Sequence, residues 1–274
     1  MRNTLRPITL FLILFGAIAT SCNMNDDPVP DLSVVNDNTE VNVAIEDLDY
    51  LTLTVLSNSG LSARTTAGIP AGNICEGAEV KLDNSAKTIT VDFGDGCTST
   101  NGVTRKGIIK LAYTGNLLFN GAKITTTFDG YEVDGKKVEG TRTITNKGAN
   151  LETNTLSLEV SITNGKVTWP DETFVTITSE QFREIQLGTQ GEYEASITGT
   201  ASGISRGGFE YTSSVTTPLI YTKNCIESGV TAPLSGILAL DFRGIQTTVD
   251  YGDGACDSSA TIFYPGGSKE IILD

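Results

Sequence analysis

Alternation of apolar and polar residues over most of the chain's middle constrains its fold more than any other feature. Between residues 156 and 162 every second residue is apolar (Leu156, Leu158, Val160, Ile162), and polar residues stand between them. Successive side chains of a β-strand point to opposite faces, so a period of two is typical of a strand with one buried face. The pattern recurs at residues 124–133, 138–145, 193–200 and 209–215. These segments predict an antiparallel meander.

Two dipeptides predict tight turns within this pattern. Asp134-Gly135 separates residues 124–133 from residues 138–145, and Asn164-Gly165 stands between the strand that ends at Ile162 and residues 166–169. Asn-Gly and Asp-Gly tolerate the positive φ angles that two-residue hairpin turns require. We therefore expect a hairpin at each dipeptide.

The expected fold is mainly β, with a large antiparallel meander that forms a one-sided sheet, a sandwich or a partial barrel. At most one or two short helices are expected. Thr39 and Glu40 precede spaced apolar residues and can cap one helix, although residues 50–55 read equally well as a strand; residues 179–187 predict another turn or two of helix. With no Pro- or Ser-rich linker after residue 38, residues 39–274 are expected to form one domain.

The first 21 residues are typical of a secretion signal. Arg2 and Arg6 precede an apolar stretch at residues 8–19, which is too short to cross a ~30 Å hydrocarbon core as a helix. The segment Ala19-Thr20-Ser21-Cys22 resembles the bacterial lipobox, in which the cysteine thiol is acylated, although Ala19 stands where leucine is usual. Cleavage before Cys22 would leave residues 22–38 as a flexible acidic tether. An ordinary signal peptide with an incidental cysteine is the alternative.

Charge bears on location and partners. Asp26 and Asp27 resemble the export signal that sends Bacteroidetes-type lipoproteins to the outer leaflet of the outer membrane, although a solvated linker would also be acidic. Removal of residues 1–21 takes away two arginines and leaves 17 basic and 33 acidic residues, a formal charge of −16. Such a chain repels a phosphate backbone, so nucleic acid is not an expected partner. Solubility is the simplest explanation of the acidity.

The four cysteines after Cys22 are an even set in a chain expected to enter an oxidising compartment. They allow three connectivities. We expect Cys75 to pair with Cys97 and Cys225 with Cys256, because each pair brackets a similar sequence. Loops of these lengths stabilise the folded state by roughly 3 to 4 kcal/mol each in the chain-entropy model. Reactive or metal-binding thiols are the alternative.

The two pairs end in related sequences, TVDFGDGC at residues 90–97 and TVDYGDGAC at residues 248–256. Each follows a β-branched run and contains the Asp-Gly step of a tight turn. The match predicts an internally duplicated, disulfide-braced hairpin, at about residues 72–115 and 222–274.

These segments also allow a metal-binding interpretation. Asp250, Asp253 and Asp257 are candidate calcium ligands, because they present hard oxygen atoms around two glycines. They lack the spacing and the closing glutamate of an EF-hand loop. A protein-kinase role for the Asp-Phe-Gly triplet is excluded, because no other kinase motif accompanies it. A braced turn is therefore the main expectation, with no cofactor other than the covalent lipid on Cys22.

Several segments together resemble a family of uncharacterised surface lipoproteins of Bacteroidetes-type bacteria. They are the lipobox, the first cysteine, DFGDGC at residues 92–97, TRKG at 104–107, VEGTR at 138–142, TGTASG at 198–203 and DYGDG at 250–254. The resemblance covers nearly all of residues 72–274. It implies a lipid-anchored protein of the outer membrane, with exposure on the cell surface as one arrangement, and implies no substrate.

The chain has no histidine, which removes Ser-His-Asp triads, Cys-His dyads and imidazole zinc sites. We expect a binding or structural role in the cell envelope, toward a glycan, a peptide or another envelope protein, rather than catalysis. The alternative is a cell-surface glycan hydrolase that uses two carboxylates, for which Asp129, Glu132 and Asp134 are candidates. Trp169, the only tryptophan, either stacks on a sugar or plugs the edge of the core.

Overall fold

The computed structural model describes residues 30–58, 74–100, 102–150, 152–189, 192–230 and 232–273. Residues 1–21, which are predicted to be a secretion signal, and Cys22, Asp26 and Asp27 lie outside these residues, so the expectations placed on them stay predictions. Within the described ranges, no helix has the length and apolar character needed to cross a bilayer.

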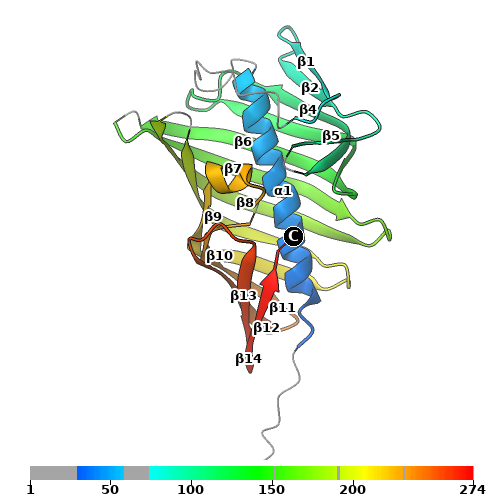
Figure 1. Cartoon of the computed structure of the whole chain (residues 1–274), viewed down its shortest axis with the longest axis vertical. Coiled ribbons are helices and arrows are strands. Elements are labelled where there is room, and N and C mark those ends of the chain that lie inside the picture. The colour runs from blue at the N-terminus through cyan, green and yellow to red at the C-terminus, as the bar shows by residue number, and fades with distance from the viewer. Residues whose placement is uncertain are drawn as a thin grey trace, which may run out of the picture.

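One antiparallel sheet accounts for most of the described chain (Figure 1). Each strand pairs with its neighbours in sequence, apart from the two-residue strand β3, which pairs only with β4. Strands β1 and β14 are the two free edges, so the sheet is not closed. The predicted mainly β meander is confirmed. The strands are β1 (Glu79–Asp83), β2 (Thr88–Asp92), β3 (Cys97–Thr98), β4 (Thr104–Tyr113), β5 (Lys123–Val133), β6 (Lys136–Asn150), β7 (Thr155–Thr168), β8 (Phe174–Leu187), β9 (Tyr193–Ile204), β10 (Glu210–Thr222), β11 (Ser235–Phe242), β12 (Ile245–Asp253), β13 (Ser259–Tyr264) and β14 (Gly267–Ile272).

Helix α1 (Ser33–Asn58) lies along the sheet, which curves around it (Figure 1). Among its described side chains only Ser33 and Asn36 are exposed, so the helix is buried on nearly every side. One continuous apolar core joins α1 to the inner face of the strands. A second helix, α2 (Lys223–Glu227), follows β10 and carries Cys225.

The start and length of α1 differ from the prediction. The helix begins inside the segment predicted as a tether, because the Asp31 carboxylate accepts the Ser33 N–H (3.0 Å) and so acts as the cap. Thr39, the predicted cap, lies inside the helix and donates its hydroxyl to the Asn36 carbonyl (2.8 Å). The alternative of a strand at residues 50–55 is wrong. Burial of that β-branched segment against the sheet outweighs its local strand propensity.

Asn164-Gly165 makes a bulge rather than the predicted hairpin turn. Strand β7 continues through the dipeptide, and its pairing with β8 shifts between Ile162 and Gly165. Asn164 does adopt the expected positive φ (50°), but the strand resumes at Gly165, where a Cβ atom would lie 2.8 Å from the Ile177 carbonyl oxygen. A positive φ angle is shared by turns and bulges, so the dipeptide alone does not distinguish them.

The other predicted turn and strands are present. Asp134 and Gly135 have φ angles of 46° and 74°, which suit the two-residue turn that joins β5 to β6. Residues 193–200 and 209–215 lie in or next to β9 and β10. Residues 179–187 belong to β8, so the predicted second helix there is wrong, because these residues complete the ladder between β7 and β9.

Both expected disulfides are present, with Cα–Cα distances of 5.6 Å for Cys75–Cys97 and 5.5 Å for Cys225–Cys256. The two related segments also have matching geometry. In each, the N–H of a glycine donates to the aspartate two positions earlier at 2.9 Å: Gly94 to Asp92 and Gly252 to Asp250. Each occupies the second strand of a three-stranded meander, β1–β2–β4 near one edge of the sheet and β11–β12–β13 near the other.

Ion pairs connect α1 to the inner face of the sheet. We call Arg105, Arg142 and Arg183 the inner arginine cluster, and Glu46, Asp47 and Asp49 the α1 carboxylates. The arginines come from β4, β6 and β8 and are at most 5% exposed. Each contacts at least one α1 carboxylate.

The geometry of these pairs fixes the helix in position. Arg183 forms a two-pronged interaction with Glu46, at 2.9 and 3.0 Å, and Arg105 Nε donates to Asp47 at 2.8 Å. Burial, aided by the nearby charge of Arg183, lowers the pKa of Arg142 to about 9, so this arginine stays charged at neutral pH.

Replacement of a single arginine should be strongly destabilising. Arg105→Met leaves Asp47 buried without a counter-charge, and we expect the free energy of unfolding to fall by about 3 to 5 kcal/mol. Urea unfolding followed by fluorescence of Trp169 measures this. The control is Lys106→Met on the same strand, whose pair with Glu132 is exposed to solvent and contributes about 1 kcal/mol or less. Equal effects of the two substitutions would contradict this role of the buried pair.

Candidate functional site

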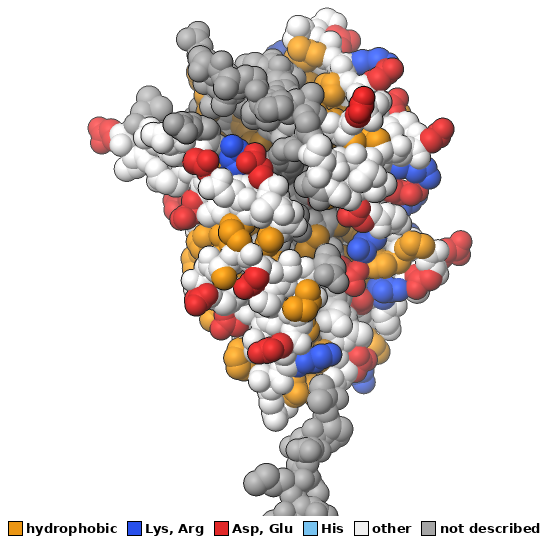
Figure 2. Space-filling view, in the orientation of Figure 1, with side chains coloured by type: hydrophobic (Ala, Val, Ile, Leu, Met, Phe, Trp, Pro, Cys, Tyr) orange, Lys and Arg blue, Asp and Glu red, His pale blue; other side chains and the backbone are white. Residues whose placement is uncertain are grey.

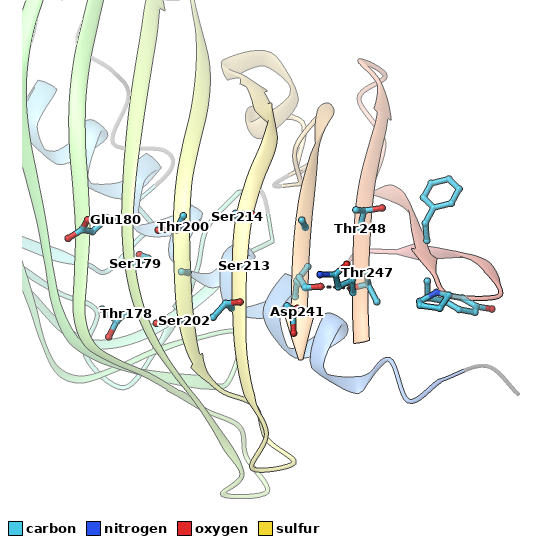
Figure 3. Close-up of a pocket in the computed structure, with 18 residues that line it drawn as sticks. Thr178, Ser179, Glu180, Thr200, Ser202, Ser213, Ser214, Asp241, Thr247 and Thr248 are labelled. Carbon is cyan, nitrogen blue, oxygen red and sulfur yellow. Dashed lines mark hydrogen bonds between the residues drawn. The ribbon is translucent and has the colours of Figure 1, made fainter. Parts of the chain in front are cut away.

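A hollow of about 960 Å³ lies on the outer face of the sheet, opposite the side that packs on α1. We call it the outer hollow. Its residues come from the six consecutive strands β8 to β13 and from Pro265, just after β13 (Figure 3). No single loop builds it, so its shape depends on the pairing of the strands.

The outward side chains of this region form two rows that cross the strands (Figure 3). Each member of a row is the register partner of the next. The first row consists of Thr178, Ser202, Thr212, Asp241 and Gln246, and the second consists of Glu180, Thr200, Ser214, Ala239, Thr248 and Phe263.

The alternation along each strand explains why these side chains face outward. In β8, Thr178 and Glu180 are exposed while Ser179 between them is 3% exposed. In β11, Asp241 is exposed and Leu240 beside it is 2% exposed. The inward side chains belong to the layer beneath α1, so the polar residues between them must point to solvent.

The outer hollow is long and narrow. Strands lie about 4.8 Å apart, so the five steps from β8 to β13 span roughly 24 Å. The two rows are only two residues apart along each strand, which is about 7 Å. The long axis of the hollow therefore runs across the strands.

The lining carries hydrogen-bonding groups and no positive charge. Hydroxyl groups of serine and threonine dominate, and Glu180, Asp241 and Gln246 add carboxylate and amide groups. Among the residues that the structure describes around it, none that lines it is lysine or arginine. At the β13 end, Phe263 is 47% exposed, and Tyr264 lies next to it. A ligand in the outer hollow would therefore meet many uncharged hydrogen-bonding groups along its length and an aromatic ring at one end.

The side of the molecule on which α1 lies carries charges of both signs. On the face shown in Figure 2, basic side chains are interspersed with acidic ones and do not gather in a patch. This face therefore offers no basic patch to a polyanionic ligand.

A small cavity of about 50 Å³ lies between α1 and the inner face of strands β6 to β10. Leu158, Ile185 and Tyr221 line its walls, and Glu46 and Arg183 stand at its polar side. Space of this size accommodates one or two water molecules rather than an organic ligand. The cavity belongs to the packing of α1.

The carboxylates considered for hydrolysis do not line the outer hollow. Asp129 is exposed on β5, and Glu132 lies 3.3 Å from the Lys106 ammonium group. Asp134 accepts the N–H of Thr104 at 2.8 Å in the turn after β5. Each therefore occupies an ordinary surface position.

Trp169 is part of the core edge and does not offer a face to a sugar. Its side chain is 9% exposed, and its indole N–H donates to Glu40 of α1 at 2.9 Å. The guanidinium of Arg206 lies over the ring, 4.7 Å from its centroid. Of the two interpretations, the structure favours the plug.

The calcium candidates do not converge on a common point. Within the described chain, no group of three or more acidic or cysteine residues is arranged to hold a metal ion. Asp250 accepts the N–H of Gly252, and Asp257 accepts both the hydroxyl (2.6 Å) and the N–H (3.0 Å) of Ser259. These two hydrogen bonds lower the pKa of Asp257 below its usual value. The structural turn accounts for both aspartates.

Sequence reasoning missed the two rows. The local signal was present, because TSE at residues 178–180, TAS at 200–202, TSS at 212–214 and QTT at 246–248 are small polar triplets in otherwise alternating strands. A row forms only when the triplets of neighbouring strands are in register. That alignment depends on turns and bulges far apart in the sequence.

Comparison of the chain with protein-family models, with curated proteins and with solved structures gives no match.

The geometry of the aspartates leads to a prediction about calcium. Because Asp250 and Asp257 already bind backbone groups, we expect millimolar calcium chloride to leave the melting temperature unchanged within about 1 °C. Differential scanning calorimetry of the mature protein, with magnesium chloride as the control salt, measures this. A rise of several degrees with calcium alone would restore the metal-binding interpretation.

Proposed function

We propose that the protein is a lipid-anchored cell-envelope protein that binds a neutral glycan in the outer hollow. The observation that carries the proposal is the pair of side-chain rows, which cross consecutive strands in register and have serine or threonine at six of their eleven positions. Sugars present dense arrays of hydroxyl groups, each both a donor and an acceptor, and serine and threonine hydroxyls complement them in both roles.

Aromatic and acidic groups strengthen this assignment. Phe263 and Tyr264 stand at one end of the outer hollow, where an aromatic ring can pack on the C–H face of a sugar. Glu180 and Asp241 can each accept hydrogen bonds from sugar hydroxyls, and such charge-assisted bonds are stronger than neutral ones. The same carboxylates repel sulfated or phosphorylated chains, so a neutral glycan fits best.

The spacing of the two carboxylates in the outer hollow favours binding over hydrolysis. Retaining and inverting glycosidases place two carboxyl groups about 5 to 10 Å apart. Glu180 on β8 and Asp241 on β11 are three strands apart, roughly 14 Å along the sheet. The separation favours binding over the two-carboxylate mechanism in this hollow.

The membrane anchor in the proposal rests on the segment before the described residues. Ten residues separate Cys22 from Ser33, the first residue of α1, so an acylated Cys22 would hold the start of α1 within about 40 Å of the bilayer. An envelope protein of this kind would present the outer hollow to glycans close to the membrane surface.

The anchor can be tested directly. In cells fed a clickable palmitate analogue, the wild-type protein should carry the label, fractionate with outer membranes and leave them only in detergent. Cys22→Ala should lose the label and most of the membrane-bound fraction, because acyl chains are the proposed attachment. Asn23→Ala serves as the matched control. An unlabelled wild-type protein, or a Cys22→Ala protein that stays labelled, would refute the anchor.

Glycan binding is tested by filling the outer hollow. Thr200→Trp places a large side chain in the second row and should weaken binding to the best ligand of a glycan array by about tenfold or more, a loss of roughly 1.4 kcal/mol. Thr127→Trp is the matched control, since Thr127 is an exposed threonine on β5, three strands away from β8 and outside the hollow. Failure of the wild-type protein to bind any neutral glycan on the array would refute the proposed function.

A further inference from the structure

The outer hollow has a direction as well as a chemical character. Its rows run perpendicular to the strands, and each strand from β8 to β12 contributes one side chain to each row. The spacing of the groups along a row is thus the distance between neighbouring strands, about 4.8 Å. This distance is close to the advance per sugar in an extended β-linked chain.

We infer that the ligand is a linear, neutral, β-linked oligosaccharide that lies across the strands, with about one sugar unit to each strand. The inference rests on the proposed function and specifies its ligand class. The span of roughly 24 Å from β8 to β13 accommodates five to six units.

The two rows suit the two edges of such a chain. They are about 7 Å apart, so the sugar rings can lie between them with hydroxyl groups directed to both sides. Thr178, Ser202 and Thr212 would serve one edge, and Thr200, Ser214 and Thr248 the other.

The ends of the outer hollow differ, which gives the ligand a polarity. Glu180 lies at the β8 end and accepts hydrogen bonds, whereas Phe263 at the β13 end offers a half-exposed ring. A terminal sugar packed on Phe263 would occupy the last position. The described lining residues include no lysine or arginine, so acidic sugars are disfavoured along the rows.

The same geometry also selects for the shape of the glycan. In an extended β-1,4-linked chain, the spacing of successive sugars stays close to the spacing of successive strands over the whole length of the hollow. A coiled α-1,4-linked chain curves away from the rows after two or three units. Binding should therefore depend on linkage as well as on length.

The experiment is isothermal titration calorimetry of the mature protein in detergent micelles with defined oligosaccharides of two to eight units. The probes are β-1,4-linked glucan, mannan, xylan and N-acetylglucosamine series, with α-1,4-linked glucan as the shape control. For at least one β-linked series we expect the Kd to fall by about tenfold or more between two and six units. From six to eight units it should change by less than about twofold.

Substitutions test whether the dependence of Kd on ligand length arises in the outer hollow. Thr248→Trp blocks the position on β12 and should move the plateau to three or four units, because only β8 to β11 stay open. Thr127→Trp on β5, outside the hollow, should leave the plateau at five to six units. Urea unfolding of both variants verifies that each is folded.

The outcomes separate this inference from the function on which it rests. Absence of binding to every series would overturn both. Binding that is independent of length, that is equal for the α-linked chain, or that keeps its plateau in Thr248→Trp would overturn the linear ligand and leave glycan binding standing.

Discussion

The structure depends on the pairing between the α1 carboxylates and the inner arginine cluster. A buried charge without a partner destabilises a protein by several kcal/mol, so α1 is held where its carboxylates meet the three arginines. The arginines stand on alternate strands, β4, β6 and β8, and one helical segment contacts all three. The helix thereby fixes how these strands are arranged around it, and the apolar residues between the ion pairs complete the core.

That arrangement leaves the outer face of the sheet free. Because α1 covers the inner face, every second side chain of each strand is buried in the core, and the side chains between them face solvent. Strands β8, β9, β10 and β12 carry serine or threonine at some or all of these outward positions, whereas β11 contributes Ala239 and Asp241. The strand register aligns these residues into two rows. The proposed ligand site is thus a product of sheet pairing. The Cys225–Cys256 disulfide stabilises the β11–β12–β13 meander, which lies beyond the strands that carry the arginine cluster. The Cys75–Cys97 disulfide stabilises the other meander, which includes β4 and its Arg105.

Prediction from sequence succeeded where the signal was local. The alternating segments, the Asp134-Gly135 turn and both disulfides follow from neighbouring residues or from a repeated motif. It failed where two structures share one local signal. Asn164-Gly165 has the positive φ of a turn but sits in a bulge, and the β-branched end of α1 reads as a strand until its burial is known. Trp169 likewise read as either a ligand contact or a core plug until its bond to Glu40 appeared.

The sequence by itself determined the class of fold, because a period of two in side-chain polarity permits only strands with one buried face. It also determined the excess of acid and the absence of histidine, which limit the chemistry. The tertiary structure alone decided that α1 fills the inner side of the sheet, and that hydroxyl groups up to about 70 residues apart stand in two rows. Ion pairing across the core and strand register are long-range properties, and no local stretch of the chain encodes either of them.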